Sequence, residues 1–398
     1  MEQGRRELMG LLRAFVHETP LTQEEFSALD LALPEVLSLC RLHGVMGIWA
    51  YKVREYYFLN GAETEDARQV YETAENLYTR TISHGVKREH AYQQLSGRLA
   101  ECGIDHLAFK GIVVKDLYPV PQLRSFGDID LAIRKEDRAS FHALMQEAGY
   151  ATTTDFEPVY TYKREGELYE VHTSIMAVNI TDRADYIDYF QGMWEHTKLL
   201  SPHVLSFTPE FHFVYLLSHI AKHIYSSGAG VRMYLDLALY VKKLGETLNW
   251  QWIEQELATL CLTDFFHLAM EMVSHWFSVP SPVAVSTAEE ELVRQFEAFT
   301  LDGGVFGFEG RTAGEQMVRK EGVRGKALLT TLFPSAKTIQ SRYTYLQKHP
   351  YLLPVAWVDR FLRNQNKIGK IAAKTNEIIH TDQKEVQKVK EFYHKIGL

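Results

Sequence analysis

The chain has 398 residues, of which 46% are hydrophobic and 24% charged, and its formal net charge is -8 at pH 7. This composition is typical of a soluble globular protein of two or three domains, and the negative charge argues against binding nucleic acid through a broadly basic surface. No apolar run reaches the ~18 residues of a membrane span, and the three cysteines are too far apart for a disulfide framework or a cysteine zinc site, so we expect a cytoplasmic protein without a membrane partner.

Residues 1–98 are predicted to form an N-terminal helical module. Apolar residues recur at three- and four-residue spacing in ELMGLLRAFV and in PEVLSLCRLHGVMGIWAYKV. A helix with a polar face is expected from about 64 to 100.

Residues 99–208 change to a pattern of short strands and helices. IDHLAFKG is predicted to be a strand that ends at a glycine, and the helix begun by IVVKDLYP is stopped by Pro119 and Pro121. RSFGDIDLAI, residues 124–133, is predicted to be a second strand, and KEDRASFHALMQEAGY a helix. PVYTYKREGELYEVHTSI contains two alternating runs around Glu165-Gly166-Glu167, a pattern typical of a β-hairpin. We therefore expect a mixed sheet flanked by helices.

Residues 209–398 return to the helical period. EFHFVYLLSHIAKHIYSS and VRMYLDLALYVKKL both place apolar residues on one helical face, and the pattern continues to the C-terminus with interruptions near 280 and at 303–313. The predicted fold class is α+β, with helical domains on either side of a mixed-sheet core.

Asp128 and Asp130 interrupt the apolar run of the second strand. Side chains two apart on a strand project from the same face, ~6 to 7 Å apart along the chain. Two ionised carboxylates at that distance repel each other unless one is protonated or a cation lies between them, and Mg²⁺ prefers such oxygen ligands. Because Asp-x-Asp is short and common, a solvated strand end is the alternative interpretation.

The second hairpin strand adds a third acid. Glu170 and His172 are two apart, hence on one face, and Glu170 can meet the aspartate pair. Three carboxylates of this kind can hold two Mg²⁺ ions ~3.5 to 4 Å apart for phosphoryl displacement. Upstream, Lys110 and Gly111 lie at a strand-to-helix turn, where backbone N–H groups and the lysine suit phosphates.

The ordered set KG, R-x-x-x-D-I-D and E-V-H resembles the polymerase-beta-type nucleotidyltransferase superfamily, specifically its bacterial branch of largely uncharacterised nucleotidyltransferases. RLHGV, H-I-A-K-H followed by V-R-x-x-x-D, LFPS and YLLPVAW also resemble that branch, so the resemblance spans most of the chain. It implies an α+β fold with a mixed-sheet nucleotidyltransferase core flanked by N-terminal and C-terminal helical domains. One departure is that Lys110-Gly111-Ile112 has neither the serine nor the second glycine usual in the superfamily's turn.

The resemblance implies magnesium-dependent transfer of an NMP from an NTP to an acceptor hydroxyl. Asp128, Asp130 and Glu170 would be the catalytic and metal-binding acids, and Glu170 would help to deprotonate the acceptor. The expected nucleotide-binding residues are Lys110, Gly111, Arg124, His172, Lys222, His223, Arg232 and Asp236. The acceptor is open and can be a small molecule, a protein or an RNA.

Two other functions compete with this interpretation. The missing serine is compatible with a catalytically silent nucleotide-binding module. His219 and His223 stand one helical turn apart and, with Asp236, would make a zinc site for a metal hydrolase, although the site would lack the glutamate of an H-E-x-x-H motif. Arg232 and Asp236 are also one turn apart and would be able to pair with each other.

Overall fold

The computed structural model describes residues 2–28, 34–226, 228–285, 288–304, 333–339, 343, 345–363 and 383–398. The chain divides into two compact units, one made of residues 1–153 and 157–308 and the other of residues 154–156 and 309–398. The first unit contains the sheet, apart from residues 154–156 of its third strand, and the helices that surround it. The predicted domain division at residues 98 and 208 stays a prediction.

The described residues before the first strand contain five helices: α1 (Glu2–Val16), α2 (Gln23–Ala28), α3 (Pro34–Leu42), α4 (Met46–Asn60) and α5 (Glu65–Glu101). The predicted helices are confirmed, but the stretch 34–53 is divided between α3 and α4 because Gly44 has a φ of 65°. The His43 ring joins this break to the later helices, since its Nε2 lies 3.0 Å from the Leu301 carbonyl oxygen and its Nδ1 accepts from the Val231 N–H.

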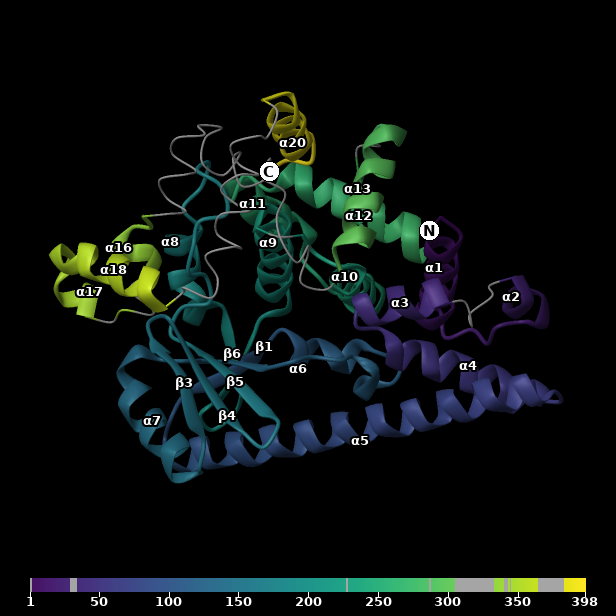
Figure 1. Cartoon of the computed structure of the whole chain (residues 1–398), viewed down its shortest axis with the longest axis horizontal. Coiled ribbons are helices and arrows are strands. Elements are labelled where there is room, and N and C mark those ends of the chain that lie inside the picture. Colours follow the sequence, from purple (N-terminus) through teal and green to yellow (C-terminus); the bar gives the residue numbers. More distant parts are fainter. Residues whose placement is uncertain are drawn as a thin grey trace. The chain divides into compact units, whose positions relative to one another are not determined.

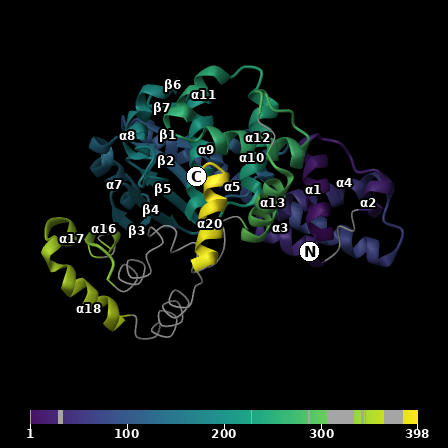
Figure 2. The ribbon, with the colours of Figure 1, turned by 90° about the horizontal axis from the view of Figure 1, so that it is seen from above.

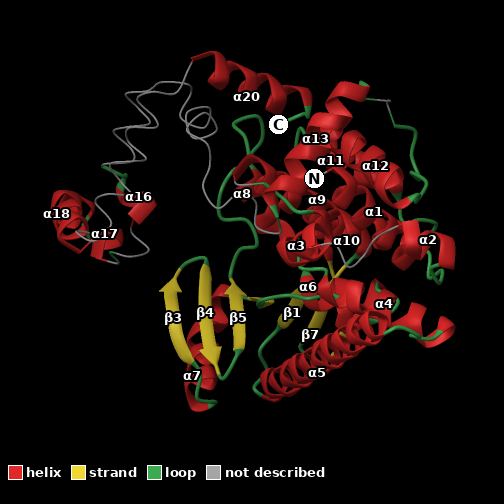
Figure 3. Cartoon of the chain, turned by 45° about the vertical axis from the view of Figure 1, so that its right-hand side comes forward, coloured by secondary structure: helices red, strands yellow, loops and turns green. Residues whose placement is uncertain are grey.

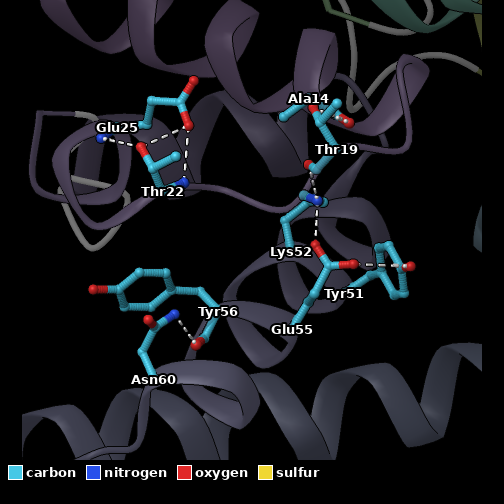
Figure 4. Close-up of polar contacts among 9 residues, drawn as sticks. All are labelled: Ala14, Thr19, Thr22, Glu25, Tyr51, Lys52, Glu55, Tyr56 and Asn60. Atoms are coloured by element: carbon cyan, nitrogen blue, oxygen red, sulfur yellow. Dashed lines mark hydrogen bonds and ion pairs between the residues drawn. The ribbon is translucent and has the colours of Figure 1, made fainter.

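Polar contacts join α4 to the segment after α1 and cap the start of α2 (Figure 4). Lys52 is fully buried, yet its ammonium donates to the Thr19 carbonyl oxygen at 2.7 Å and pairs with Glu55. At the start of α2, the Thr22 N–H donates to Glu25 and the Glu25 N–H donates to the Thr22 hydroxyl. This reciprocal capping satisfies two N–H groups that the helix itself leaves without acceptors.

The described strands form one mixed seven-stranded sheet in the order β3-β4-β5-β2-β1-β7-β6. Their bounds are β1 (His106–Phe109), β2 (Ile129–Ile133), β3 (Ala151–Phe156), β4 (Val159–Arg164), β5 (Glu167–His172), β6 (Thr197–Ser201) and β7 (Val204–Phe207). β2 pairs antiparallel with β1 and parallel with β5, and β4 and β5 form the predicted hairpin (Figure 3). The α+β fold class is thus confirmed, whereas the sequence patterns did not identify β3, β6 or β7.

The sheet has helices on both faces (Figure 1). Alternate residues of β2 and β5, such as Leu131 and Val171, join a core cluster with Leu99 of α5 and Phe141 of α7 (Arg138–Glu147). The opposite face meets the long helix α9 (Pro209–Ser226), where the rings of Phe109 and Tyr215 are 5.4 Å apart. Residues that alternate with the core positions of β2 and β5 therefore project toward α9.

Two expected elements are shorter than the sequence predicted. The helix after β1 is a single turn, α6 (Gly111–Val114), continued by the 3₁₀ turn Lys115–Leu117. The predicted strand 124–133 begins only at Ile129, where its register with β5 starts. Arg124 follows the 3₁₀ turn Pro121–Leu123, and its side chain donates to Asp236, which lies outside the sheet. The residues before Ile129 therefore do not extend the strand.

The first unit also contains α8 (Tyr186–Gln191), α10 (Val231–Leu244), α11 (Trp250–Thr259), α12 (Thr263–Phe277) and α13 (Glu290–Gly303). α10 packs against α9 and α12, and α1 packs against α10 and α12, so the first helix joins the helices that follow the sheet (Figures 1 and 2). Among the helices that the structure describes, none is long and apolar enough to cross a bilayer.

The second unit contains α16 (Ala336–Ile339), α17 (Tyr345–Lys348), α18 (Leu353–Arg363) and α20 (Gln383–Lys395). Trp357 of α18 donates its indole N–H to the Pro334 carbonyl oxygen, which links LFPS to YLLPVAW. The predicted interruption at 303–313 and much of the helical pattern beyond Asn364 fall on 305–332 and 364–382, outside the described residues.

Candidate functional site

A cavity of about 320 Å³ lies between the sheet and helices α9 and α10. Its walls come from the β1–α6 turn, the segment before β2, and the facing sides of β2, β5, α9 and α10. All of the predicted site residues except His172 line it: Lys110, Gly111, Arg124, Asp128, Asp130, Glu170, Lys222, His223, Arg232 and Asp236. The fold thus brings residues up to 126 positions apart in the sequence to one cavity. Its volume is within the range typical of small-molecule sites.

Strand register places the acids together. Asp130 and Glu170 are directly opposite each other in the parallel pair β2–β5, and His172 is opposite Ala132. Because Ile129, Leu131, Tyr169 and Val171 take the core face, the intervening Asp130, Glu170 and His172 share the face toward α9.

Three side chains form a candidate metal centre. One ligand atom each from Asp130, Glu170 and His172 lies within 4.8 Å of the others. His172 Nε2 is 3.0 Å from Asp130 Oδ1 and 3.8 Å from Glu170 Oε2. Asp128 lines the same cavity, in the bend before β2, but it is outside this group of three.

Lys110 provides the cationic partner of the centre. Its Nζ donates to Asp130 Oδ1 at 2.6 Å, and both side chains are largely buried. Burial opposes ionisation of Asp130, but Lys110 and His172 outweigh it and hold the pKa of that carboxyl at about 2. Asp130 is therefore a carboxylate throughout the neutral range.

The other two acids have the opposite shift. Burial, followed by the charge of Asp130, raises the pKa of Asp128. Burial and then the charges of Asp128 and Asp130 raise the pKa of Glu170, and burial lowers the pKa of His172. Lys110 pairs with Asp130, and a bound cation would relieve the repulsion among the three carboxylates that contributes to the raised pKa values of Asp128 and Glu170.

Gly111 occupies a position that no larger residue fits without movement. A Cβ there would be 2.5 Å from Arg124 Nη1 and 3.0 Å from the Phe126 Cβ. The preceding Lys110 has a φ of 56°, so the chain turns sharply into α6. Because α6 is only one turn long, its dipole is weak, and the expected contribution of a helix N-terminus to phosphate binding has less physical basis than the sequence indicated.

Arg124 and Asp236 are partners of each other. Arg124 donates from Nε to Asp236 Oδ1 at 3.1 Å and from Nη2 to Oδ2 at 2.6 Å, and the Tyr118 hydroxyl donates to Oδ1 at 2.7 Å. The Arg232–Asp236 pair considered from the sequence is not what the fold makes, because both Asp236 oxygens are used by these donors. This bond couples the segment before β2 to α10.

Two cations at the cavity lack a carboxylate partner among the described residues. Arg232 donates to the Ser125 hydroxyl at 3.0 Å, its Nε has no hydrogen-bond partner, and burial together with the charge of Arg124 lowers its pKa to about 10. Burial and the charge of Lys110 lower the pKa of Lys222 to about 8. Unpaired cations in a cavity favour an anionic ligand.

The structure does not support the zinc alternative. His223 Nε2 lies 3.2 Å from His219 Nε2, so the pair does form on α9. Asp236, the expected third ligand, is held by Arg124 and Tyr118. Within the described parts of the chain, Asp130, Glu170 and His172 form the one group of three clustered metal-ligating side chains, and it does not include these histidines.

Sequence reasoning missed Arg88 and Tyr118. The Arg88 guanidinium lies 5.3 Å from the Phe126 ring centroid, and the charge of Asp128 acts on its pKa, which burial lowers. Arg88 occupies an ordinary polar position on the 37-residue helix α5, so no local motif marks it. Tyr118 next to Pro119 reads as the end of a helix, and only the fold reveals its bond to Asp236.

A family described as uncharacterised nucleotidyltransferase matches residues 31–278, which is more than half of the chain. The match includes every residue that lines the cavity. Neither the curated proteins nor the solved structures provide a match.

Proposed function

The chain belongs to the uncharacterised nucleotidyltransferase family, and on this premise we propose that it is a magnesium-dependent enzyme that transfers an NMP from an NTP to an acceptor hydroxyl. The acceptor is a small molecule, a protein or an RNA, and the reaction takes place in the cytoplasm. The observation that carries the proposal is the convergence of Asp130, Glu170 and His172 within 4.8 Å, beside a cavity that Asp130 and Glu170 line together with cations that lack a carboxylate partner.

The residues at the centre fit a divalent cation. Asp130 and Glu170 offer carboxylate oxygens, the ligands that suit Mg²⁺ and Mn²⁺, and His172 adds an imidazole nitrogen to the group. Asp128 lies near enough for its charge to raise the pKa of Glu170, so it is our candidate ligand for a second ion. A bound cation supplies Lewis acidity, which polarises the phosphate oxygens and makes the acceptor hydroxyl easier to deprotonate.

The triphosphate is assigned to the cationic walls of the cavity. Lys110 and Gly111 form the turn on the sheet side, and Arg232 and Lys222 approach from α10 and α9. Arg124 is fixed by Asp236 and contributes its charge from a constant position. His223 lies beside Lys222 in the same wall and completes the proposed nucleotide-binding set.

Glu170 is the proposed general base. Its raised pKa makes the Glu170 carboxylate a stronger base than the carboxylate of an exposed glutamate, so it accepts a proton more readily. The acceptor oxygen forms a bond to the α phosphorus as its proton passes to Glu170, and the bond between the α phosphorus and the bridging oxygen to the β phosphorus breaks. Pyrophosphate leaves, and Lys110, Lys222 and Arg232 offset the charge it carries.

Calorimetry tests the proposal at the binding step. We expect NTP to bind in the presence of Mg²⁺ and binding to be lost when Asp128→Asn and Asp130→Asn are combined. The matched control is Asp137→Asn, because Asp137 lies at the N-terminal end of α7 and does not line the cavity. Failure of the intact protein to bind millimolar NTP would contradict the proposal.

Turnover separates an enzyme from a silent nucleotide-binding module. The protein is incubated with NTP labelled at the α phosphate and a cell lysate, with the Asp128→Asn, Asp130→Asn double variant in parallel. Label that appears on an acceptor with the wild type alone supports transfer and identifies the acceptor class. Nucleotide binding without any labelled acceptor would favour the silent module.

A further inference from the structure

The ammonium of Lys110 lies where the candidate metal centre would attract a cation. Lys110 Nζ and His172 Nε2 both contact the same atom, Asp130 Oδ1, at 2.6 and 3.0 Å. His172 Nε2 in turn lies 3.8 Å from Glu170. The lysine therefore already neutralises the carboxylate that is central to the group of three.

A divalent cation and this ammonium compete for Asp130, because the single negative charge of its carboxylate cannot offset both. A cation held by Asp130, Glu170 and His172 needs the carboxylate that Lys110 now binds, and at such a distance two positive charges repel strongly in a largely buried site. Binding of the cation by itself thus weakens the Lys110–Asp130 ion pair and leaves the buried ammonium without its hydrogen-bonded carboxylate partner.

The phosphates of a nucleotide would remove that cost. Lys110 is on the β1–α6 turn and lines the cavity, so its flexible side chain can exchange the Asp130 carboxylate for a phosphate oxygen inside the same cavity. The cation then takes Asp130 and the phosphates take Lys110. The phosphates replace the negative charge that Lys110 gives up, and the cation replaces the positive charge that Asp130 gives up. Binding of each ligand therefore favours binding of the other.

We propose that Lys110 is a positioning residue that couples the two ligands, so that the site takes up the divalent cation together with nucleotide phosphates and binds the free cation weakly. This inference rests on the proposed function and adds to it that the nucleotide binds together with the divalent cation. It concerns the lysine's choice of partner, and it is tested by binding rather than by turnover.

The first measurement is Mn²⁺ affinity without nucleotide, from the electron paramagnetic resonance signal of free Mn²⁺. Lys110→Met should tighten Mn²⁺ binding by about tenfold or more, because the competing ammonium is gone. Lys222→Met is the matched control: it also removes one lysine from the cavity wall, but Lys222 acts on Asp130 and Glu170 only through its charge and has no ion pair with Asp130 among the described residues, so any tightening should be clearly smaller. Equal tightening in both variants, or none in Lys110→Met, would overturn the inference.

The second measurement is the affinity for a non-hydrolysable NTP analogue in EDTA. Lys110→Met should weaken it, while the same substitution tightens Mn²⁺ binding. A variant that is simply misfolded would weaken both, so opposite signs are diagnostic. Lys110→Arg keeps a cation at the position and should leave free Mn²⁺ binding weak, within about threefold of the wild type; tight binding there would count against the inference.

These outcomes are distinguishable from failure of the proposed function. If the wild type binds no NTP analogue with Mn²⁺, the nucleotidyltransferase proposal fails, whatever Lys110→Met does to the free cation. If the wild type binds the analogue with Mn²⁺ but Lys110→Met does not tighten Mn²⁺ binding, the coupling by Lys110 fails and the proposed function stands.

Discussion

Arg124 and Asp236, 112 residues apart in the chain, form a buried bidentate ion pair with N···O distances of 3.1 and 2.6 Å. The pair joins the segment before β2 to α10, and the Tyr118 hydroxyl also donates to Asp236. Because Arg124 Nη1 lies against Gly111, the same pair fixes the wall of the cavity at the β1–α6 turn. An ion pair between α10 and the segment before β2 therefore shapes the wall of the cavity to which we assign the phosphates.

Loss of Asp236 should destabilise the protein strongly. Asp236→Ala leaves the Arg124 guanidinium buried without its carboxylate, and we expect a loss of about 3–5 kcal/mol in the free energy of unfolding, measured by urea denaturation. The double variant Arg124→Met, Asp236→Leu should be more stable than Asp236→Ala because no buried charge is left unpaired. A loss of about 1 kcal/mol or less in Asp236→Ala, the size typical of an exposed pair, would contradict this interpretation.

Gly111→Ala should distort the turn at the cavity. The new Cβ would meet Arg124 Nη1 at 2.5 Å and the Phe126 Cβ at 3.0 Å, and Arg124 cannot withdraw without loosening its bond to Asp236. We expect the free energy of unfolding to fall by about 1–3 kcal/mol and NTP affinity to fall with it. Gly127→Ala is the matched control: it lines the same cavity, nothing lies within 4 Å of its added Cβ, and its effect should stay within about 0.5 kcal/mol. Equal effects at both glycines would argue against this packing.

Local patterns were sufficient to predict the two strands that carry Asp130 and Glu170. Period-two alternation with Leu131 and Val171 in the core is a property of the sequence itself, and the parallel register then sets the two acids opposite each other. The helical period likewise gave α5 and α9. These features depend on neighbouring residues, which is why sequence reasoning reached them.

Features set by distant partners were not accessible in the same way. Asp128 was assigned to the strand, yet the chain before Ile129 follows the Arg124–Asp236 pair rather than the sheet. Arg232 was considered a partner of Asp236 from its helical spacing, but a buried arginine from another segment takes that carboxylate. The contacts of Arg88 likewise arise only when α5 packs beside the segment that contains Phe126. Such contacts depend on tertiary packing, for which one sequence gives no signal.

Arg232→Met should separate stability from binding. Arg232 has no carboxylate partner among the described residues, its Nε makes no hydrogen bond, and Arg124 repels it. Removing a poorly compensated cation should leave the free energy of unfolding unchanged or raise it, since apolar replacements of buried charges are often neutral or stabilising. NTP affinity should nevertheless fall by about tenfold or more, as a charge-assisted contact to phosphate is lost. Chemical denaturation and calorimetry on the same samples check both, and lowered stability with unchanged affinity would contradict the assignment.

Nucleotide binding should weaken as the pH rises through about 8. Burial and the charge of Lys110 lower the pKa of Lys222 to about 8, below the model-peptide value near 10.5, so its side chain is a cation at pH 7 and largely neutral at pH 9. The cationic form of Lys222 attracts phosphates, and raising the pH removes that form. Bound phosphate shifts the midpoint of the transition to higher pH. Fluorescence titration with an NTP analogue from pH 7 to 9.5 measures the effect. Lys222→Arg stays charged over this range, so its affinity should decline less steeply than that of the wild type. Parallel pH profiles for the two proteins would place the titrating group elsewhere in the cavity.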